Sequence, residues 1–224
     1  MVEIYLSDEE QEEALRNWWR ENWRWILSGI AIGLALLGGW KFWQQTQLHR
    51  AEEASARYLD LTKAAQRNDA AKVEQLTREL QEKYAASPYA QQANLALAKI
   101  RVDAGKWDEA AASLRDVVDH AKDPGLVQIG KLRLARVLIQ QNKNDDALAL
   151  LDPAKAVAYA AQVHELRGDA LYAKGDTTGA RGEYQQALSA QMGAAGPEAA
   201  QLLELKIQDL GEAAPAPAQS TKAP

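Results

Sequence analysis

Apolar residues follow two patterns along this chain: one long uninterrupted run near the N-terminus, and a helical spacing after it. The run reads W-I-L-S-G-I-A-I-G-L-A-L-L-G-G-W. Extended from Trp23 to Trp43 it covers 21 residues, or about 31 Å of helix, which matches the hydrocarbon core of about 30 Å of a bilayer. Arg24 and Lys41 can reach the headgroups, and Trp residues gather at both ends. The pattern predicts a single transmembrane helix.

Two other interpretations of the apolar run fit less well. A cleaved signal peptide would begin with basic residues and end in small ones, whereas this chain begins acidic and the run ends in bulky aromatic residues. A buried helix of a soluble domain would leave the aromatic belts unexplained. Basic residues within about 20 positions of the span are equally numerous on its two sides. The charge count therefore does not orient the helix.

Within the run, Gly29 and Gly33 form a G-x-x-x-G pair. Small residues at this spacing let a second membrane helix approach closely, so the pair predicts helix packing in the bilayer. The alternative is an accidental match, because Gly is common in such helices. Before the run, apolar residues at helical spacing predict an amphipathic lead-in.

After the span, similar residues recur with a period of about 34, which indicates a helical repeat array. Three copies carry small residues at positions 8 and 20, where two antiparallel helices cross closely. These pairs are Ala98 with Ala110, Ala135 with Ala147, and Gly168 with Ala180. The pattern resembles the tetratricopeptide repeat, with a plain helical bundle as the alternative.

The turns inside the three copies have their own signals. Gly105, Asn142 and Gly175 can adopt the left-handed conformation that ends a first helix. Three aspartates stand near the starts of the second helices, where we expect them to act as N-caps. They are Asp108, Asp145 and Asp176.

The chain is therefore expected to be all-α, with one N-terminal transmembrane helix followed by a tetratricopeptide-like α-solenoid. Position 27 of the same repeat frame falls at Ala154, which we expect on the second helix of its unit. A weaker unit precedes the three copies, and a terminal helix over residues 197–210 covers the last one. The expected segments are a lead-in (1–22), the membrane helix (23–43), the repeat domain (44–210) and a disordered Pro/Ala-rich tail (211–224).

Composition narrows the range of functions. The formal net charge of −5 and the pI of about 5.3 lack the basic footprint of a nucleic-acid binder. The absence of cysteine excludes disulfides and thiolate chemistry. The three histidines stand apart from one another, and no phosphate-binding or nucleophile motif occurs. We expect no enzyme activity, no cofactor and no metal.

By analogy with tetratricopeptide arrays, the first helix of each unit lines a concave groove. The residues at the groove positions are Leu95, Lys99, Val102, Ile129, Leu132, Arg136, Ile139, Glu165, Asp169 and Tyr172. Their mixture of apolar and charged side chains suits a peptide segment of a partner protein. For Leu95 and Leu132, packing between units is an almost equally good interpretation.

The order of the parts is distinctive. An acidic start leads to W-W-R-E-N-W, a span ending in G-G-W-K-F-W, then A-E-E-A-S, Y-A-A-S-P-Y-A and the degenerate repeats. In this order the chain resembles the YfgM family of proteobacterial inner-membrane proteins. The resemblance covers most of the chain, except for the Pro/Ala-rich tail.

The resemblance implies an ancillary subunit of the SecYEG translocon, with a cytoplasmic N-terminus and a periplasmic repeat domain. It also implies association with PpiD, a membrane-anchored periplasmic chaperone, in assisting exported proteins. It offers no catalytic residues. An alternative is a membrane-anchored scaffold that sequesters a signalling protein of the envelope stress response, which a cytoplasmic repeat domain would favour.

Overall fold

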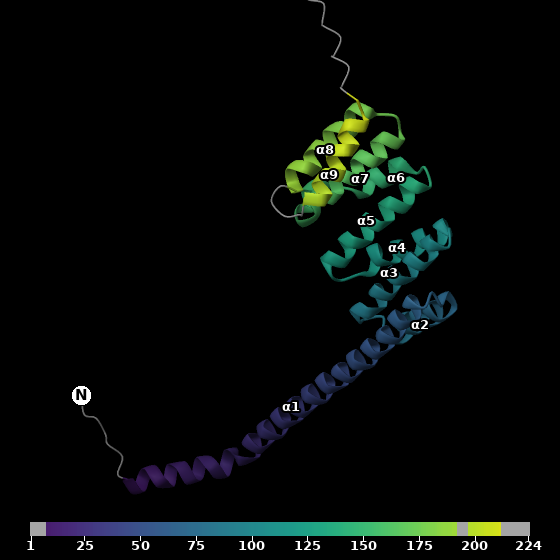
Figure 1. Ribbon diagram of the computed structural model, residues 1–224. Helices are drawn as coiled ribbons and strands as arrows, with labels where there is room; N and C mark the ends of the chain where they lie inside the picture. The colour runs from purple at the N-terminus through teal and green to yellow at the C-terminus, as the bar shows by residue number, and fades with distance from the viewer. Residues whose placement is uncertain (1–7, 192–196, 212–224) are drawn as a thin grey trace, which may run out of the picture. The chain divides into compact units, whose positions relative to one another are not determined.

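The computed structural model describes residues 8–191 and 197–211, and this part of the chain is helical with no β-strand (Figure 1). The all-α prediction is thus confirmed. The chain divides into two compact units, Met1–Glu53 and Ala54–Pro224. Most of the predicted tail lies outside the described residues, as does the start of the predicted lead-in.

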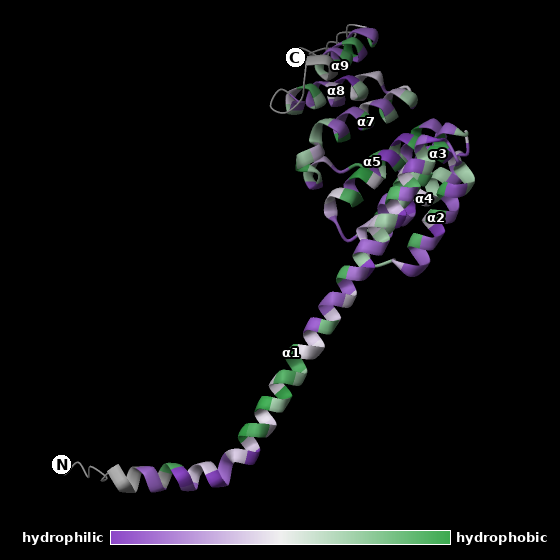
Figure 2. Cartoon of the chain, turned by 60° about the horizontal axis from the view of Figure 1, so that its bottom comes forward, coloured by the Kyte–Doolittle hydropathy of each residue, from purple (hydrophilic) through white to green (hydrophobic). Residues whose placement is uncertain are grey.

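The first unit consists of the N-terminal part of α1 (Asp8–Gln66). Figure 2 shows the hydrophobic stretch in the middle of this helix, with more hydrophilic turns on either side. Among the described residues it is the one helix long and apolar enough to cross a membrane, and none of its apolar window is buried. Exposure of the whole window argues against a core helix of a soluble domain.

Polar side chains within and just after this stretch bond to the helix backbone. Ser28 Oγ donates to the Arg24 carbonyl at 2.7 Å, and Thr46 Oγ1 donates to the Phe42 carbonyl at 2.9 Å. A hydroxyl that is satisfied within its own helix needs no water. These residues can therefore approach or enter a bilayer without leaving a polar group unpaired.

The second unit is a stack of antiparallel helix pairs (Figure 1). The last part of α1 pairs with α2 (Ala70–Lys83), α3 (Pro88–Asp103) with α4 (Trp107–His120), and α5 (Pro124–Gln140) with α6 (Asn144–Leu150). Two short 3-10 helices follow, η1 (Pro153–Lys155) and η2 (Val157–Tyr159). The last elements are α7 (Ala160–Ala173), α8 (Thr177–Gln191) and α9 (Pro197–Asp209).

Each first helix ends at a residue with positive φ. The residues are Asn68, Gly105, Asn142 and Gly175, and Gly211 follows α9 in the same way. After the turn, the amide of Lys106 donates to the Arg101 carbonyl at 2.8 Å and that of Asp176 to the Leu171 carbonyl at 3.0 Å. This bond closes a helix end when the preceding residue is left-handed. The three turns predicted from Gly and Asn are therefore confirmed, and Asn68 adds a fourth.

The predicted small-residue pairs lie at the helix crossings. Ala98, Ala110, Ala135, Ala147 and Ala180 are almost completely buried. Gly168 is also buried, and a Cβ at this position would collide with the ring of Tyr184. The helices of each pair thus pack at the expected positions, where a larger side chain would hold them apart.

The capping prediction is confirmed for one aspartate and wrong for two. Asp176 caps α8, because its carboxylate accepts from the Gly179 amide at 2.8 Å. Helices α4 and α6 begin earlier than expected, after Lys106 and Lys143, which provide no side-chain cap. Asp108 and Asp145 therefore lie inside the first turns, where negative charge still suits the helix dipole.

The two displaced aspartates reach to the next helix pair instead. Asp108 accepts from Gln141 Nε2 at 3.0 Å and lies 3.5 Å from Lys143 Nζ, and Asp145 pairs with Lys174 at 2.5 Å. Lys143 and Lys174 each belong to the turn of the following pair. We call these contacts the inter-unit bridges.

The second half of the copy that contains Ala135 and Ala147 also departs from prediction. Helix α6 ends at Leu150, and Ala154 lies exposed in η1 rather than on a second helix. Pro153 has no amide hydrogen and disfavours helical conformation in the residue before it. The proline therefore ends α6 early, and the two 3-10 helices replace its last turns.

The end of the stack agrees with prediction. Leu203 of α9 is buried against Ala180, Tyr184 and Ala187 of α8, with Ile207 beside it. The terminal helix thus covers apolar residues that the last pair would otherwise expose.

Candidate partner-binding surface

The predicted groove residues lie on α3, α5 and α7, the first helices of three pairs, but at different depths. Leu95 and Leu132 are each 7% exposed and belong to the central core. Ile129 and Ile139 are half-buried and pack against the same core. These four side chains therefore support the surface from beneath. Tyr172, by contrast, is 59% exposed.

A pocket of about 360 Å³ opens between α3 and α5. It brings together three of the predicted groove residues, Lys99, Val102 and Arg136. Its remaining lining consists of Ala98, Trp107, Leu114, Arg133, Val137 and Gln140. The volume lies at the small end of the range for ligand pockets and suits one large or two small side chains. We call this site the α3–α5 pocket.

Trp107 is the pocket residue that sequence reasoning missed. It is the first residue of α4, directly after the turn at Gly105, and its half-buried side chain packs against the central core. The signal was present, since Trp107 is the one tryptophan outside residues 18–43. An interfacial aromatic belt does not account for Trp107, and tryptophan is a common anchor residue in binding surfaces.

The charged groups around the α3–α5 pocket are basic. Lys99 is exposed and pairs with Asp103 at 2.5 Å. Arg133 and Arg136 are exposed, and within the described part of the chain neither has a carboxylate at ion-pair distance. Burial raises the pKa of the Tyr58 phenol, and the positive charge of Arg133 partly offsets this shift. The pocket thus has an apolar floor and a positive rim, although the whole chain is acidic.

Glu165 and Asp169, the predicted acidic groove residues, are occupied by the terminal helix. Lys206 Nζ lies 2.8 Å from a carboxylate oxygen of each. The Tyr184 hydroxyl donates to Asp169 at 2.8 Å, and Lys206 Nζ lies 5.3 Å from the centre of the Tyr184 ring. We call this network of four side chains the α9 latch.

The α9 latch perturbs two of its members. Burial raises the pKa of Tyr184, and the hydrogen bond to Asp169 raises it further. Burial alone would lower the pKa of Lys206, but its hydrogen bonds to Asp169 and Glu165 outweigh this and raise it. The acidic end of the groove is therefore partly neutralised within the chain, whereas the open charges of the α3–α5 pocket are positive.

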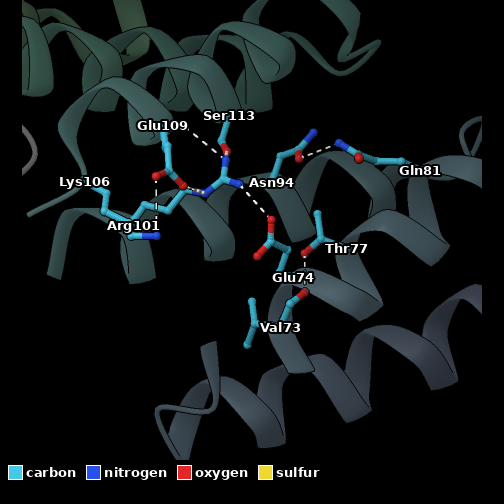
Figure 3. Close-up of polar contacts among 9 residues, drawn as sticks. All are labelled: Val73, Glu74, Thr77, Gln81, Asn94, Arg101, Lys106, Glu109 and Ser113. Atoms are coloured by element: carbon cyan, nitrogen blue, oxygen red, sulfur yellow. Dashed lines mark hydrogen bonds and ion pairs between the residues drawn. The ribbon is translucent and has the colours of Figure 1, made fainter. Parts of the chain in front are cut away.

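A second polar cluster joins α2, α3 and α4 (Figure 3). Arg101 lies 3.3 Å from Glu74 of α2 and donates to Ser113 of α4 at 2.7 Å. Buried Asn94 accepts from Gln81 at 2.7 Å and donates to Asp116. Other copies have leucine where Arg101 stands, at Leu138 and Leu171. This cluster is satisfied by its own members, and we assign it to holding the first two helix pairs together.

No metal site accompanies these surfaces. In residues 8–191 and 197–211, no group of three or more His, Cys, Asp and Glu side chains is placed to hold an ion.

Comparison with known proteins shows what this arrangement is similar to. A family described as tetratricopeptide repeat-like domain matches residues 16–212. An ancillary SecYEG translocon subunit of Escherichia coli (strain K12) is 32% identical over 212 residues, covering 93% of this chain and 99% of the relative. The chain belongs to this family. The resemblance drawn from the order of sequence motifs is thereby confirmed.

Other family members agree. An ancillary SecYEG translocon subunit of Haemophilus influenzae is 32% identical, covering 82% of this chain and 90% of the relative. Among solved structures, BtubC from P. vanneervenii aligns with a TM-score of 0.55 at 18% identity, covering 72% of this chain and 82% of BtubC. At that identity the likeness concerns the fold alone, and it supports the helical solenoid of this family member.

Proposed function

We propose that this protein is a single-pass inner-membrane adaptor that acts as an ancillary subunit of the SecYEG translocon. The observation that carries the proposal is the match to relatives of that name along almost the whole of both chains. The match includes the apolar helix as well as the repeats, so the two parts are shared together. A binding role, rather than catalysis, suits a tetratricopeptide repeat-like domain.

The orientation we propose places the N-terminus in the cytoplasm and the repeat domain in the periplasm. There the repeats would link the translocon to a PpiD-type chaperone that assists exported proteins. The family resemblance supports this arrangement, and the helical solenoid offers the extended surface that such a link requires.

For the repeat domain, we propose that the α3–α5 pocket is the principal partner site. Trp107 and Val102 provide an apolar floor, and Arg133 and Arg136 provide unpaired positive charge. A fitting partner segment has one large apolar side chain with carboxylates beside it, because such a segment fills the floor and neutralises the rim. Tyr172 of α7, whose ring is exposed, is a further residue at a predicted groove position.

For the membrane helix, we propose lateral packing through Gly29 and Gly33. Both glycines have open space where a Cβ would lie, so another helix can approach the backbone there. Replacing both by Leu should weaken association with the translocon and leave the fold of the repeats unchanged.

Site-specific photo-crosslinking in the membrane tests the function. Crosslinkers replace Leu34 in the apolar helix, Arg136 at the pocket, and Arg115 as an exposed control outside the pocket. We expect Leu34 to capture translocon subunits and Arg136 to capture a periplasmic chaperone, with neither product at Arg115. If no translocon subunit is captured from any position in the span, the adaptor proposal is wrong.

Topology separates the adaptor from the regulatory scaffold. The chain has no cysteine, so single variants Glu13→Cys and Thr178→Cys can be labelled cleanly in spheroplasts with an impermeant maleimide. Both positions are exposed. We expect labelling at residue 178 alone. Labelling at residue 13 alone would place the repeats in the cytoplasm and favour a scaffold that sequesters a signalling protein.

A further inference from the structure

A combined stripe of basic and aromatic side chains runs along α1 on the N-terminal side of the span. Its arginines are four residues apart, so they follow one face of the helix, and the residue before each arginine forms an adjacent apolar row. The stripe consists of Leu15, Arg16, Trp19, Arg20, Trp23 and Arg24. All six are exposed, with Leu15, Trp19 and Trp23 at 66%, 56% and 45%. We call this set the Arg–Trp stripe.

The charges of the Arg–Trp stripe have no partner in the described part of the chain. No carboxylate there lies at ion-pair distance from Arg16, Arg20 or Arg24, whereas Arg101 and Arg167 of the repeat domain are both paired. Three exposed arginines without an ion-pair partner, beside exposed tryptophans, leave positive charge and aromatic surface open to an anionic ligand.

Neighbouring acidic residues do not occupy the same face near the span. Glu12 and Glu13 precede Arg16, so along the helix they lie farther from the bilayer than any of the arginines. Glu21 lies about 60° around the helix from Arg24, beyond the edge of the arginine row. Of the charges on this flank, Arg24 thus lies closest to the apolar stretch. Glu12 and Glu13 lie beyond the arginines, and Glu21 lies off the arginine row.

Helix geometry places Arg24 and Trp23 at the edge of the hydrocarbon core, Arg20 at headgroup depth and Arg16 just outside the headgroup layer. With Trp23 at the edge of the hydrocarbon core, Arg20 and Arg16 follow about 4.5 and 10.5 Å farther along the helix axis. The headgroup layer adds about 5–7 Å on each side of the core, and arginine side chains can extend along a helix to reach it. Trp19 and Trp23 suit the boundary between the two layers.

We propose that the Arg–Trp stripe binds the phosphate groups of anionic phospholipids in the leaflet on the N-terminal side. A guanidinium group pairs with phosphate through two parallel hydrogen bonds, and the adjacent aromatic rings insert beside the headgroup. An added net negative charge on the lipid strengthens the attraction over that of a zwitterionic headgroup. The proposal rests on the membrane span and is independent of the translocon and chaperone.

The other flank of the span provides an internal control. After Trp43 the next basic side chain that is permanently charged is Arg50, and the residues between them include Gln44, Gln45 and Gln47. That flank has no arginine row, so anionic lipid should be selected on one side only.

Native mass spectrometry of the purified full-length protein tests this. The protein is released from nanodiscs that contain equal amounts of phosphatidylglycerol and phosphatidylethanolamine, and the retained lipids are counted. We expect the wild type to retain phosphatidylglycerol preferentially, and the variant R16Q/R20Q/R24Q to lose that preference by about tenfold or more. The matched control K41Q/R50Q/R57Q removes the same number of charges and should keep it.

The arginine-to-lysine variant R16K/R20K/R24K separates charge from geometry. It keeps the charge but not the paired hydrogen bonds, so we expect an intermediate preference. Equal losses in the Gln variant and the matched control would overturn the proposal, as would a wild type without lipid preference. If the bilayer shows no preference but the Gln variant loses translocon crosslinks in cells, a protein occupies the stripe instead.

Discussion

Gly168 shows how one missing methyl group shapes a helix crossing. Its backbone packs directly on the ring of Tyr184, and a Cβ would enter that ring. The two equivalent crossings have alanine instead, at Ala98 and Ala135, and there a leucine occupies the place of the tyrosine. The small residue and the large one are therefore matched as a pair within each unit.

Gly168→Ala should lower the free energy of unfolding of the repeat domain by about 1–2 kcal/mol. Overpacking a core costs about 1–3 kcal/mol, and the better helix propensity of alanine returns about 0.5–1 kcal/mol of that. Urea unfolding followed by circular dichroism measures the change.

Two further variants make this prediction specific. Tyr184→Leu removes the hydrogen bond to Asp169 and has a cost of its own, but in the Tyr184→Leu background Gly168→Ala should cost much less, because the pairing found at Ala98 is restored. Gly182→Ala is the matched control, since open space surrounds it within α8, and it should stabilise the domain slightly. A loss at Gly168 that Tyr184→Leu does not relieve would contradict the argument.

At the residue scale, the roles of residues that recur in each repeat could be predicted from the sequence. The roles of residues that depart from the repeat pattern could not. Gly168 and the alanines were found because the frame demands small residues there. Arg101 was missed because it replaces the usual leucine, and its role depends on Glu74, which lies 27 residues away. Asp108 failed as a cap because the helix begins two residues earlier, after Lys106, which changes what a short side chain can reach.

At the scale of elements, the α9 latch decides how the stack ends. Lys206 holds two carboxylates of α7, and Leu203 covers the apolar face of α8. The terminal helix was predictable from its apolar spacing. Its effect on the groove was not, because the pattern places Glu165 and Asp169 at open positions without indicating that a later lysine returns to them.

Lys206→Met should weaken the docking of α9 by about 1–2 kcal/mol at neutral pH, because hydrogen bonds to charged groups are worth about 1.5–3 kcal/mol and these are partly exposed. Its folded pKa is raised, so its contribution is complete below the ordinary lysine value of about 10.4 and is lost as the pH rises through the folded value. The raised pKa of Tyr184 acts in the same direction. Urea unfolding of both proteins across alkaline pH checks this.

The two curves should converge at high pH, where lysine is neutral in the wild type as well. A difference between wild type and Lys206→Met that persists unchanged well above the folded pKa would show that the methionine disturbs packing rather than charge. Lys174→Met, which removes an exposed ion pair with Asp145, is the control and should change stability little.

The early end of α6 also shows an element that departs from the repeat pattern. Pro153 was visible in the sequence, but the repeat frame outweighed it and placed Ala154 on a helix. A local rule with a steric cause, the missing amide of proline, prevailed over the periodic pattern. The ends of helices are thus better predicted from helix-breaking residues such as proline than from the repeat frame.

At the scale of the molecule, the boundary between the two compact units falls inside one continuous helix, α1. The residues after the boundary already belong to the core of the repeat domain, since Ala54 and Leu61 are fully buried with Val73. The sequence predicted both parts, but a helix without a break gives no sign of where one unit ends.

A fragment of residues 54–211 should therefore fold without the membrane helix. We expect a soluble, helical protein with a cooperative thermal transition, whereas the full chain requires detergent or lipid. Circular dichroism and sedimentation measure both properties. A fragment that begins at residue 70 loses Leu61 and Ala64 from the core and should be clearly less stable, and equal stability of the two fragments would place the boundary elsewhere.

The inter-unit bridges add one more consequence. Each joins the first turn of a second helix to the turn of the next pair, and each is largely open to solvent. Such contacts contribute little to the free energy of unfolding, but in a stack where each unit touches only its neighbours they restrain the rotation from one unit to the next. Because salt screens exposed ion pairs, added salt should change the pitch of the superhelix at concentrations that leave its melting temperature unchanged.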